Sequence, residues 1–421
     1  MSKIKIVFIK FGGLSAGGTE RWLQMMAANL PKDTFEIDYY YCDTAPYVGS
    51  DYKHAGINKD RLTYMEFNNV NLIKFHVGKK DISTKTHDWI DTDFWKKFDE
   101  TKYDIVQAAK AGPAEYPYHK INLPIVEFIA LDSCVDFSPN IARSIHISKW
   151  QQLRWKSKGG NLKKSTLIPV PAQLPVTNEN FRKEYNIPEK ALVAGFHQRA
   201  DNNIFSPIPL EAFSRIKNPQ FYFALLCGSS KYKALAEKLR IKNIRFIKPK
   251  SDELTISKFL NTLDIFAHGR KDGETFGTVF AEAMMHKKPC LSHWSPIANA
   301  HKETMGPAGL FAKDLDDYTE KLHSLFTNHE LRKKLALSAK PFAEKHYSLQ
   351  AAVKNLAKIY HDVYKKHKSY KKSKFKYAIH AYNNIDILVR KYGVARKIKK
   401  VITNPKLIIK KACYLFTKDD I

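Results

Sequence analysis

The sequence lacks any apolar run long enough to cross a membrane. A membrane-spanning helix needs about twenty consecutive apolar residues, and no stretch of the 421 residues approaches this length. The N-terminal segment Lys3–Lys10 has an apolar core that is too short and too interrupted for a signal peptide, and its pattern is typical of a first buried strand. We therefore expect a cytoplasmic protein, with peripheral attachment to the cytoplasmic face of a membrane as the alternative.

Cysteine pairs and metal-ligand patterns are also missing. The five cysteines are an odd number and form no C-x-x-C pair, which favours a reducing compartment over a disulfide framework. No group of histidine, cysteine and acidic residues has metal-ligand spacing. The D-x-D sequence at Asp314–Asp316 precedes a predicted helix, so we expect it to cap that helix. The sequence thus predicts neither a metal nor a cofactor.

Acidic residues are few beside the basic ones, with 42 Asp and Glu against 70 Lys and Arg and a net charge of +28. From Lys365 to the end, seventeen basic residues stand against three aspartates, a net charge of +14. Apolar stripes among these lysines and arginines are typical of interfacial helices on anionic leaflets. We predict a basic amphipathic tail over 365–421 that meets an anionic membrane surface rather than nucleic acid. A helix packed on the other domains, with its charges in water, is the alternative.

The length is that of two domains rather than one. Short apolar runs alternate with helical patterns, which favours parallel strands and crossover helices. The strands that this pattern predicts in the first half are Phe35–Tyr41, Leu62–Phe67, Ile105–Ala108 and Ile125–Ile129. We predict that the polar segment Val70–Glu100 is surface helix and loop, with its aromatic side chains facing the core. Prolines 169, 171 and 175 predict a stiff linker near 170–185.

The most informative stretch is Gly273–Met284. An apolar run ends at Ala267, a helical pattern follows Gly277, and Pro289 lies just past it. The N–H groups of Gly277, Thr278 and Val279 then open a helix, where its dipole favours an anion such as a phosphate. Glu274 and Glu282 flank this helix start, so they could accept bonds from hydroxyl groups of the same ligand. These features suggest a nucleotide sugar; the alternative is that both glutamates are solvated helix charges.

The same stretch resembles the E-x7-E signature of retaining group-1 glycosyltransferases with the GT-B fold. The matching residues are Glu274-x-Phe276-Gly277, Glu282-Ala283-Met284 and Pro289. The resemblance implies an α/β protein of two facing Rossmann-like domains, here with a basic helical C-terminal extension. It implies that Glu274 contacts the donor sugar, Glu282 the ribose, and the backbone after Phe276-Gly277 the diphosphate. The expected domains are 1–172 on the acceptor side and 173–345 on the nucleotide-sugar side, with a helix at 346–364 crossing back to the first domain.

Further site residues follow from the resemblance. The turn with Gly12 and Gly13 matches a donor-binding turn, although its spacing is not that of a dinucleotide fingerprint. Arg199 matches an arginine that grips the diphosphate, and with Glu274 it is a candidate catalytic residue. The lysine expected five residues later is replaced by Ile204, for which Arg270 or Lys271 could substitute. Glu127 and Asp132 are acceptor-side candidates, with ordinary loop carboxylates as the alternative.

The resemblance therefore implies transfer of a sugar from a nucleotide diphosphate sugar to a carbohydrate or lipid-linked glycan acceptor, with retention of configuration and no required metal. Cell-surface polysaccharide or glycoconjugate synthesis is the expected setting. Because Ile204 replaces the lysine, a GT-B-fold epimerase or an inactive relative is the alternative. A polyanion-binding protein that acts through its basic tail is a further alternative of another class.

Overall fold

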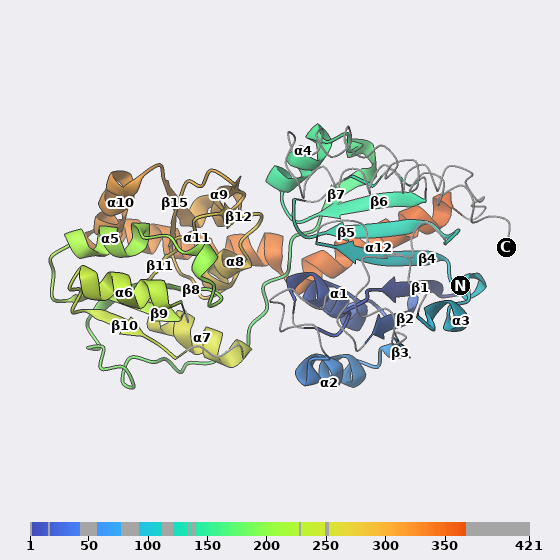
Figure 1. Ribbon diagram of the computed structural model, residues 1–421, viewed down its shortest axis with the longest axis horizontal. Helices are drawn as coiled ribbons and strands as arrows, with labels where there is room; N and C mark the ends of the chain where they lie inside the picture. Colours follow the sequence, from blue (N-terminus) through green and yellow to red (C-terminus); the bar gives the residue numbers. More distant parts are fainter. Residues whose placement is uncertain are drawn as a thin grey trace, which may run out of the picture. The chain divides into compact units, whose positions relative to one another are not determined.

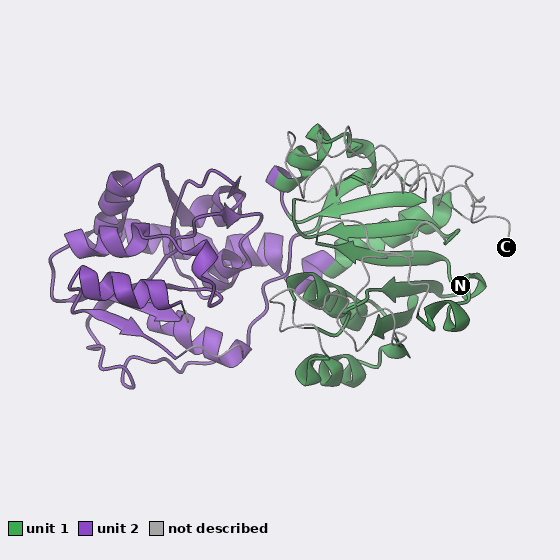
Figure 2. Ribbon diagram, viewed as in Figure 1, with its two compact units in different colours: residues 1–147, 151–168, 353–421 green, residues 148–150, 169–352 purple. Residues whose placement is uncertain are grey.

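The computed structural model describes residues 2–15, 17–42, 57–76, 92–111, 121–132, 135–136, 138, 140–226, 229–248 and 252–367. The chain forms two compact units (Figure 2). Unit 1 contains residues 1–147, 151–168 and 353–421, and unit 2 contains residues 148–150 and 169–352. The predicted basic tail lies outside the described residues from position 368 onward.

Unit 1 is built on a seven-stranded parallel sheet with the order β3-β2-β1-β4-β5-β6-β7 (Figure 1). The strands are β1 (Ile4–Ile9), β2 (Phe35–Cys42), β3 (Asn71–Phe75), β4 (Ile105–Lys110), β5 (Ile125–Ile129), β6 (Ile141–His146) and β7 (Ser165–Leu167). The helices are α1 (Gly18–Asn29), α2 (Lys59–Phe67), α3 (Phe94–Lys97), η1 (Glu100–Lys102), α4 (Lys149–Ser157) and η3 (Leu162–Lys164). The central strands are buried along their whole length, as expected for a parallel sheet covered on both faces.

Two predictions for unit 1 are wrong. Leu62–Phe67 is not a strand but the end of α2, which begins after Asn58, whose side chain accepts a hydrogen bond from the Arg61 N–H. The segment after it is not only helix and loop, because β3 pairs with β2 there. The aromatic residues of the segment that the structure describes do face the core: Phe94 is fully buried, and Trp95 and Phe98 pack against the same cluster.

Unit 2 repeats the same topology with a six-stranded parallel sheet of order β10-β9-β8-β11-β13-β15. The strands are β8 (Leu192–His197), β9 (Phe221–Leu226), β10 (Ile244–Phe246), β11 (Ile265–Ala267), β13 (Cys290–His293) and β15 (Gly309–Ala312). Two short strands, β12 (Gly273–Glu274) and β14 (Ala298–Asn299), pair with each other beside this sheet. In both sheets the first strand in sequence is central, which is the order of a Rossmann-like fold.

The helices of unit 2 alternate with its strands. They are η4 (Asn202–Ile204), α5 (Ile208–Arg215), α6 (Ser230–Lys238), α7 (Glu253–Thr262), α8 (Thr278–Met285), α9 (His301–Met305), η5 (Gly306–Ala308), α10 (Leu315–Thr327) and α11 (His329–Tyr347). The predicted cap at Asp314 is confirmed, because its side chain accepts a hydrogen bond from the Asp317 N–H at the start of α10.

The last described helix, α12 (Leu349–Lys366), carries the chain from unit 2 into unit 1. Its Tyr360 is fully buried, lies against Phe35 of β2, and donates a hydrogen bond of 2.7 Å to the side-chain oxygen of Gln107 in β4. Both partners belong to unit 1, so α12 supplies part of the core of a unit whose strands come much earlier in the sequence; Gln107 lies 253 residues before Tyr360. Among the described residues, no helix is long and apolar enough to span a membrane.

Candidate functional site

A histidine stands at or just after the end of three neighbouring strands of unit 2. β8 ends at His197, β13 ends at His293, and His268 directly follows β11. Because these strands are parallel and adjacent in the sheet, the three residues share its carboxyl edge. Open α/β sheets bind their ligands at this edge, and the loop that carries the predicted signature also leaves the sheet here.

The signature loop, residues 273–277, is fixed by hydrogen bonds that its backbone carbonyl groups accept. Three successive carbonyl oxygens accept hydrogen bonds: that of Glu274 from the Ala300 N–H at 3.0 Å, that of Thr275 from Ser148 Oγ at 2.6 Å, and that of Phe276 from Thr304 Oγ1 at 2.6 Å. Together with the pairing of β12 and β14, these bonds fix the backbone up to the first turn of α8.

Helix α8 begins at a glycine in the left-handed region. Gly277 has φ 86° and ψ 69°, and a Cβ atom there would lie 2.7 Å from Cδ2 of Phe280. No side chain caps the helix, and within the described part of the chain the N–H groups of Gly277, Thr278 and Val279 donate to no protein acceptor. These donors lie at the positive end of the helix dipole, where a negatively charged group is favoured.

Glu274 lies beside this helix start. Its side chain is 16% exposed, and its Oε1 accepts a hydrogen bond of 3.0 Å from Arg270 Nη1. Arg270 also forms a two-bond contact with Asp272, at 2.5 and 2.9 Å. Burial raises the pKa of the Glu274 carboxyl, while the charge of Arg270 and, more weakly, that of Arg199 favour the ionised form. The structure thus brings Glu274 and Arg199 into one electrostatic environment.

Glu282 lies inside α8 and is nearly buried. Its Oε2 lies 3.4 Å from Nε2 of His197. Burial lowers the pKa of His197 to about 4, so this imidazole is neutral near pH 7 and the contact is not an ion pair. The carboxylate faces the end of β8, which is the strand that leads to Arg199.

Arg199 follows β8 on the open side of the sheet edge. Its guanidinium is 64% exposed and lies 3.1 Å from a carboxylate oxygen of Asp201. Ile204, at the position of the expected lysine, is buried in η4 and is 2% exposed. The backbone N–H of Lys271 donates to the Ile204 carbonyl at 3.1 Å, and the Lys271 side chain is exposed. The position of the expected lysine is therefore occupied by the apolar side chain of Ile204, and Lys271 lies next to it in the adjacent backbone segment.

The glycine turn of unit 1 is packed by its own domain. The Gly13 carbonyl accepts hydrogen bonds of 2.8 Å from both Tyr39 Oη and Gln24 Nε2. A Cβ atom at Gly13 would lie 2.8 Å from the Tyr39 ring, whereas one at Gly12 would meet only Ser15 Oγ, at 3.8 Å. Gly13 is therefore required for packing, and Gly12 has free space around it.

The two acceptor-side candidates, Glu127 and Asp132, both lie in ion pairs with basic side chains of unit 1. Glu127 is fully buried in β5, where its carboxylate lies 2.7 Å from Lys110 Nζ and accepts a hydrogen bond from Ser144 Oγ. This is an interior ion pair, so the expectation that Glu127 faces an acceptor at an open edge is corrected. Asp132 is partly exposed and forms ion pairs with both Arg154 and Lys158; its contact with an acceptor stays a prediction.

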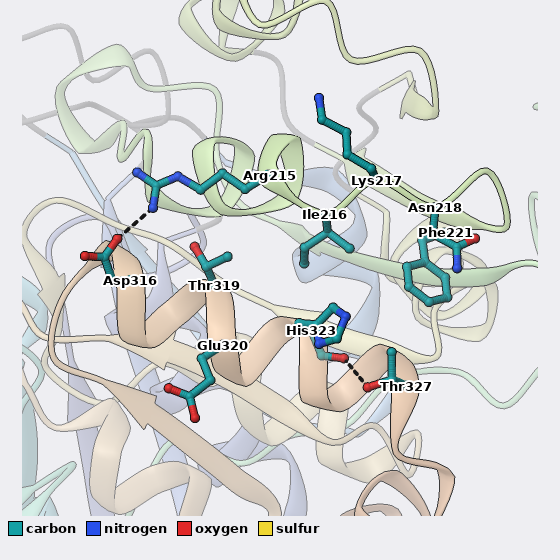
Figure 3. Close-up of a pocket in the computed structure, with 10 residues that line it drawn as sticks. All are labelled: Arg215, Ile216, Lys217, Asn218, Phe221, Asp316, Thr319, Glu320, His323 and Thr327. Atoms are coloured by element: carbon teal, nitrogen blue, oxygen red, sulfur yellow. Dashed lines mark hydrogen bonds and ion pairs between the residues drawn. The ribbon is translucent and has the colours of Figure 1, made fainter.

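A surface cavity of about 570 Å³ lies elsewhere on unit 2 (Figure 3). Arg215 at the end of α5 and Phe221 at the start of β9 line it, together with residues of α10 such as Asp316, with which Arg215 pairs. Because strand starts lie at the amino edge of a parallel sheet, this cavity is on the edge opposite the signature loop. None of the predicted site residues lines it.

The histidines of unit 2 do not form a metal centre. Within the described ranges, no group of three or more His, Cys, Asp or Glu side chains is arranged to hold an ion. His293 instead donates from Nδ1 to the Trp294 carbonyl at 2.7 Å and accepts from Ser206 Oγ at 3.0 Å. His301 donates from Nε2 to the His293 carbonyl at 3.0 Å.

A family comparison covers the part of unit 2 that carries this helix start. Residues 177–341 match the sequence model of the family described as "Glycosyl transferases group 1". This segment lies within unit 2 and contains the signature loop, α8 and Arg199. Over these residues unit 2 is similar to group 1 glycosyltransferases, in agreement with the resemblance in the sequence.

Solved structures extend the comparison to the whole described fold. A glycosyltransferase from Rickettsia africae is 16% identical, with a TM-score of 0.67, covering 86% of this chain and 99% of that chain. Anabaena HepE in complex with UDP and glucose is 16% identical, with a TM-score of 0.60 and coverage of 85% and 100%. Sucrose-phosphate synthase from Thermosynechococcus elongatus is 13% identical, with a TM-score of 0.62 and coverage of 86% and 100%. At these identities the likeness establishes the fold, which is GT-B. No curated protein sequence matches the chain.

Sequence reasoning missed two features of the site. It found no metal-ligand spacing among the histidines and gave them no role, although each of His197, His268 and His293 stands at the end of an apolar strand run. It also considered Arg270 as a cation for the ligand, whereas Arg270 is engaged by Asp272 and Glu274.

Proposed function

We propose that the protein transfers a sugar from a nucleotide diphosphate sugar to a carbohydrate or lipid-linked glycan acceptor, with retention of configuration and without a metal. The observation that carries this proposal is the uncapped start of α8 beside Glu274. Three backbone N–H donors are available there for a diphosphate, next to a carboxylate that can accept bonds from sugar hydroxyls. Nucleotide diphosphate sugars carry both chemical groups in one molecule.

In the proposed reaction, the diphosphate binds at Gly277, Thr278 and Val279. As the bond between the sugar and the diphosphate breaks, negative charge grows on the leaving phosphate, and preorganised N–H donors and cations stabilise it. Glu274 holds hydroxyls of the donor sugar and Glu282 the ribose. The acceptor hydroxyl attacks from the face that the diphosphate leaves, and the leaving phosphate takes its proton, which gives retention without a protein nucleophile.

We propose that Lys271 supplies the cation that Ile204 does not. The Lys271 backbone is bonded to the Ile204 carbonyl, which places an exposed lysine beside the position of the expected one. Arg270 is unsuited to this role because both of its carboxylate partners already hold it. Arg199 and Lys271 are thus the two side-chain cations proposed for the diphosphate.

The first experiment is a thermal-shift series with UDP, GDP and ADP. A ligand at one hundred times its dissociation constant stabilises the folded state by about 2.7 kcal/mol, so we expect a clear rise in Tm with one of the three. The binding of UDP by HepE makes UDP the first choice. A rise with none of them would contradict the donor site. A rise without sugar transfer from the matching nucleotide sugar to glycan acceptors would favour the epimerase or the inactive relative.

A further inference from the structure

His268 lies directly behind Glu274, and its place in the site has no counterpart in the sequence predictions. It follows β11, it is 1% exposed, and its backbone N–H donates to the Leu291 carbonyl of β13 at 2.8 Å. Its Nε2 lies 3.8 Å from Oε1 of Glu274. This nitrogen is buried, and within the described part of the chain it has no hydrogen-bond partner. A buried polar atom without a partner is costly, so a role in the ligand-bound state is the natural explanation.

The surroundings of His268 fix its charge and its tautomer. The rings of Phe196, Phe266 and Phe280 surround the imidazole, with centroids 5.7, 6.1 and 4.8 Å away. Burial in this apolar environment holds the pKa of His268 well below its usual range, so the ring is neutral. A neutral imidazole carries one proton. Ser292 Oγ lies 3.5 Å from Nδ1, and a lone pair on Nε2 would repel the Glu274 carboxylate. The carboxylate therefore favours a proton on Nε2, directed at Oε1, and the Ser292 hydroxyl can donate to the unprotonated Nδ1 that remains.

The two oxygens of Glu274 then have different roles. Arg270 Nη1 donates to Oε1 at 3.0 Å, and His268 Nε2 faces the same oxygen. No donor within the described ranges binds Oε2, which leaves this oxygen for a ligand. Arg270 is the one described donor bonded to this carboxylate. A second bond to Oε1, from His268, would stop the carboxylate from rotating and so set the direction of Oε2.

We propose that His268 is a positioning residue that donates its Nε2 proton to Oε1 of Glu274 and so directs Oε2 at the hydroxyls of the donor sugar. This inference rests on the proposed function. The 3.8 Å separation is longer than a hydrogen bond. Such bonds are often long in the free protein and shorten in the complex. A carboxylate shift of roughly 1 Å, driven by sugar hydroxyls that bind Oε2, closes the gap. His197 and Oε2 of Glu282 repeat the arrangement at 3.4 Å.

The test compares two amides at position 268. In His268→Gln the side-chain nitrogen replaces Nε2, whereas in His268→Asn it replaces Nδ1 and cannot reach Glu274. The full-length variants are titrated calorimetrically with UDP and with UDP-glucose, or with the corresponding pair for the nucleotide that stabilises the wild-type protein. We expect His268→Asn to bind the nucleotide sugar about tenfold more weakly, the value of one hydrogen bond to a charged group. It should bind the nucleoside diphosphate like the wild type, and His268→Gln should recover most of the lost affinity.

Three results would overturn the proposal: unchanged affinity of His268→Asn for the nucleotide sugar, an equal loss for both ligands, or an equal loss in both variants. An equal loss for both ligands would mean that His268 supports the whole site by packing. The proposed function fails by a different result, since in that case the wild-type protein itself binds neither ligand.

Discussion

At the scale of residues, the cations around the signature loop are divided between two tasks. Arg270 is 19% exposed and forms ion pairs with Asp272 and Glu274, so its charge stabilises the loop itself. Arg199 is 64% exposed and Lys271 is also exposed, so their charges are accessible to a ligand. Under the proposed function, Arg199 and Lys271 would give the diphosphate two cations although position 204 carries no lysine.

The division predicts the effect of removing either accessible charge. We expect Arg199→Ala to lower turnover about one hundredfold, because a preorganised donor to a developing charge contributes about 3 kcal/mol to the transition state. Lys271→Gln should lower turnover by a comparable factor. Sugar transfer at saturating donor measures both, and Lys242→Gln, an exposed lysine next to β10, is the matched control. Near-normal turnover of Arg199→Ala would show that Arg199 is not one of the cations that stabilise the diphosphate.

At the scale of elements, the start of α8 depends on one backbone conformation. Gly277 adopts φ 86°, and the space beside it is filled by the Phe280 ring. A side chain at this position would move the first turn, and with it the N–H groups that face the ligand. Under the proposed function, anion binding at this helix therefore depends on the conformation of the residue before the helix rather than on a charged side chain.

This dependence predicts the result of Gly277→Ala. The left-handed conformation costs a non-glycine residue about 1–2 kcal/mol, and the contact with Phe280 adds to it. We expect the free energy of unfolding to fall by about 1–3 kcal/mol in urea denaturation, together with weaker binding of the nucleoside diphosphate. Gly18→Ala is the control, because no atom lies within 4 Å of a Cβ atom at Gly18, the first residue of α1. Equal stability of the two variants would show that Gly277 is not conformationally required.

At the scale of the whole molecule, both units bury neutral histidines. Burial lowers the pKa of His146 in unit 1, and of His197 and His301 in unit 2, to about 4 in each case. Their ordinary value is 6.5. Between pH 6.5 and 4 the unfolded chain therefore binds more protons than the folded chain, so the free energy of unfolding decreases as the pH falls through this window.

We accordingly expect acid destabilisation well above the range in which carboxylates titrate. At pH 5 each of the three histidines lowers the free energy of unfolding by about 2 kcal/mol relative to pH 7. Urea denaturation at the two pH values measures the difference. His146→Phe should reduce it for unit 1, because phenylalanine fills a similar space and has no proton to bind. The same pH dependence in this variant would show that other groups cause the acid loss.

Local sequence patterns were sufficient for much of this architecture. The central strands and the capped start of α10 at Asp314 were predicted, because hydrophobic period and capping act over a few neighbouring residues. The prediction of a strand at Leu62–Phe67 was wrong and β3 was missed, because local patterns do not show which segments pair. A short apolar run is compatible with a strand or a helix, and only its partners in space decide between them.

The helix start of the candidate site could be located from the sequence, since Glu274, Gly277 and the first turn of α8 are contiguous and their geometry is local. Only the tertiary structure decided what surrounds it. His197, His268 and His293 come together because parallel pairing brings the ends of three separate strands to one edge. Burial then makes these imidazoles neutral, places Glu127 in an interior ion pair and commits Arg270 to Glu274. Charge state and partner choice depend on desolvation and on contacts between distant segments, which are properties of the packed chain.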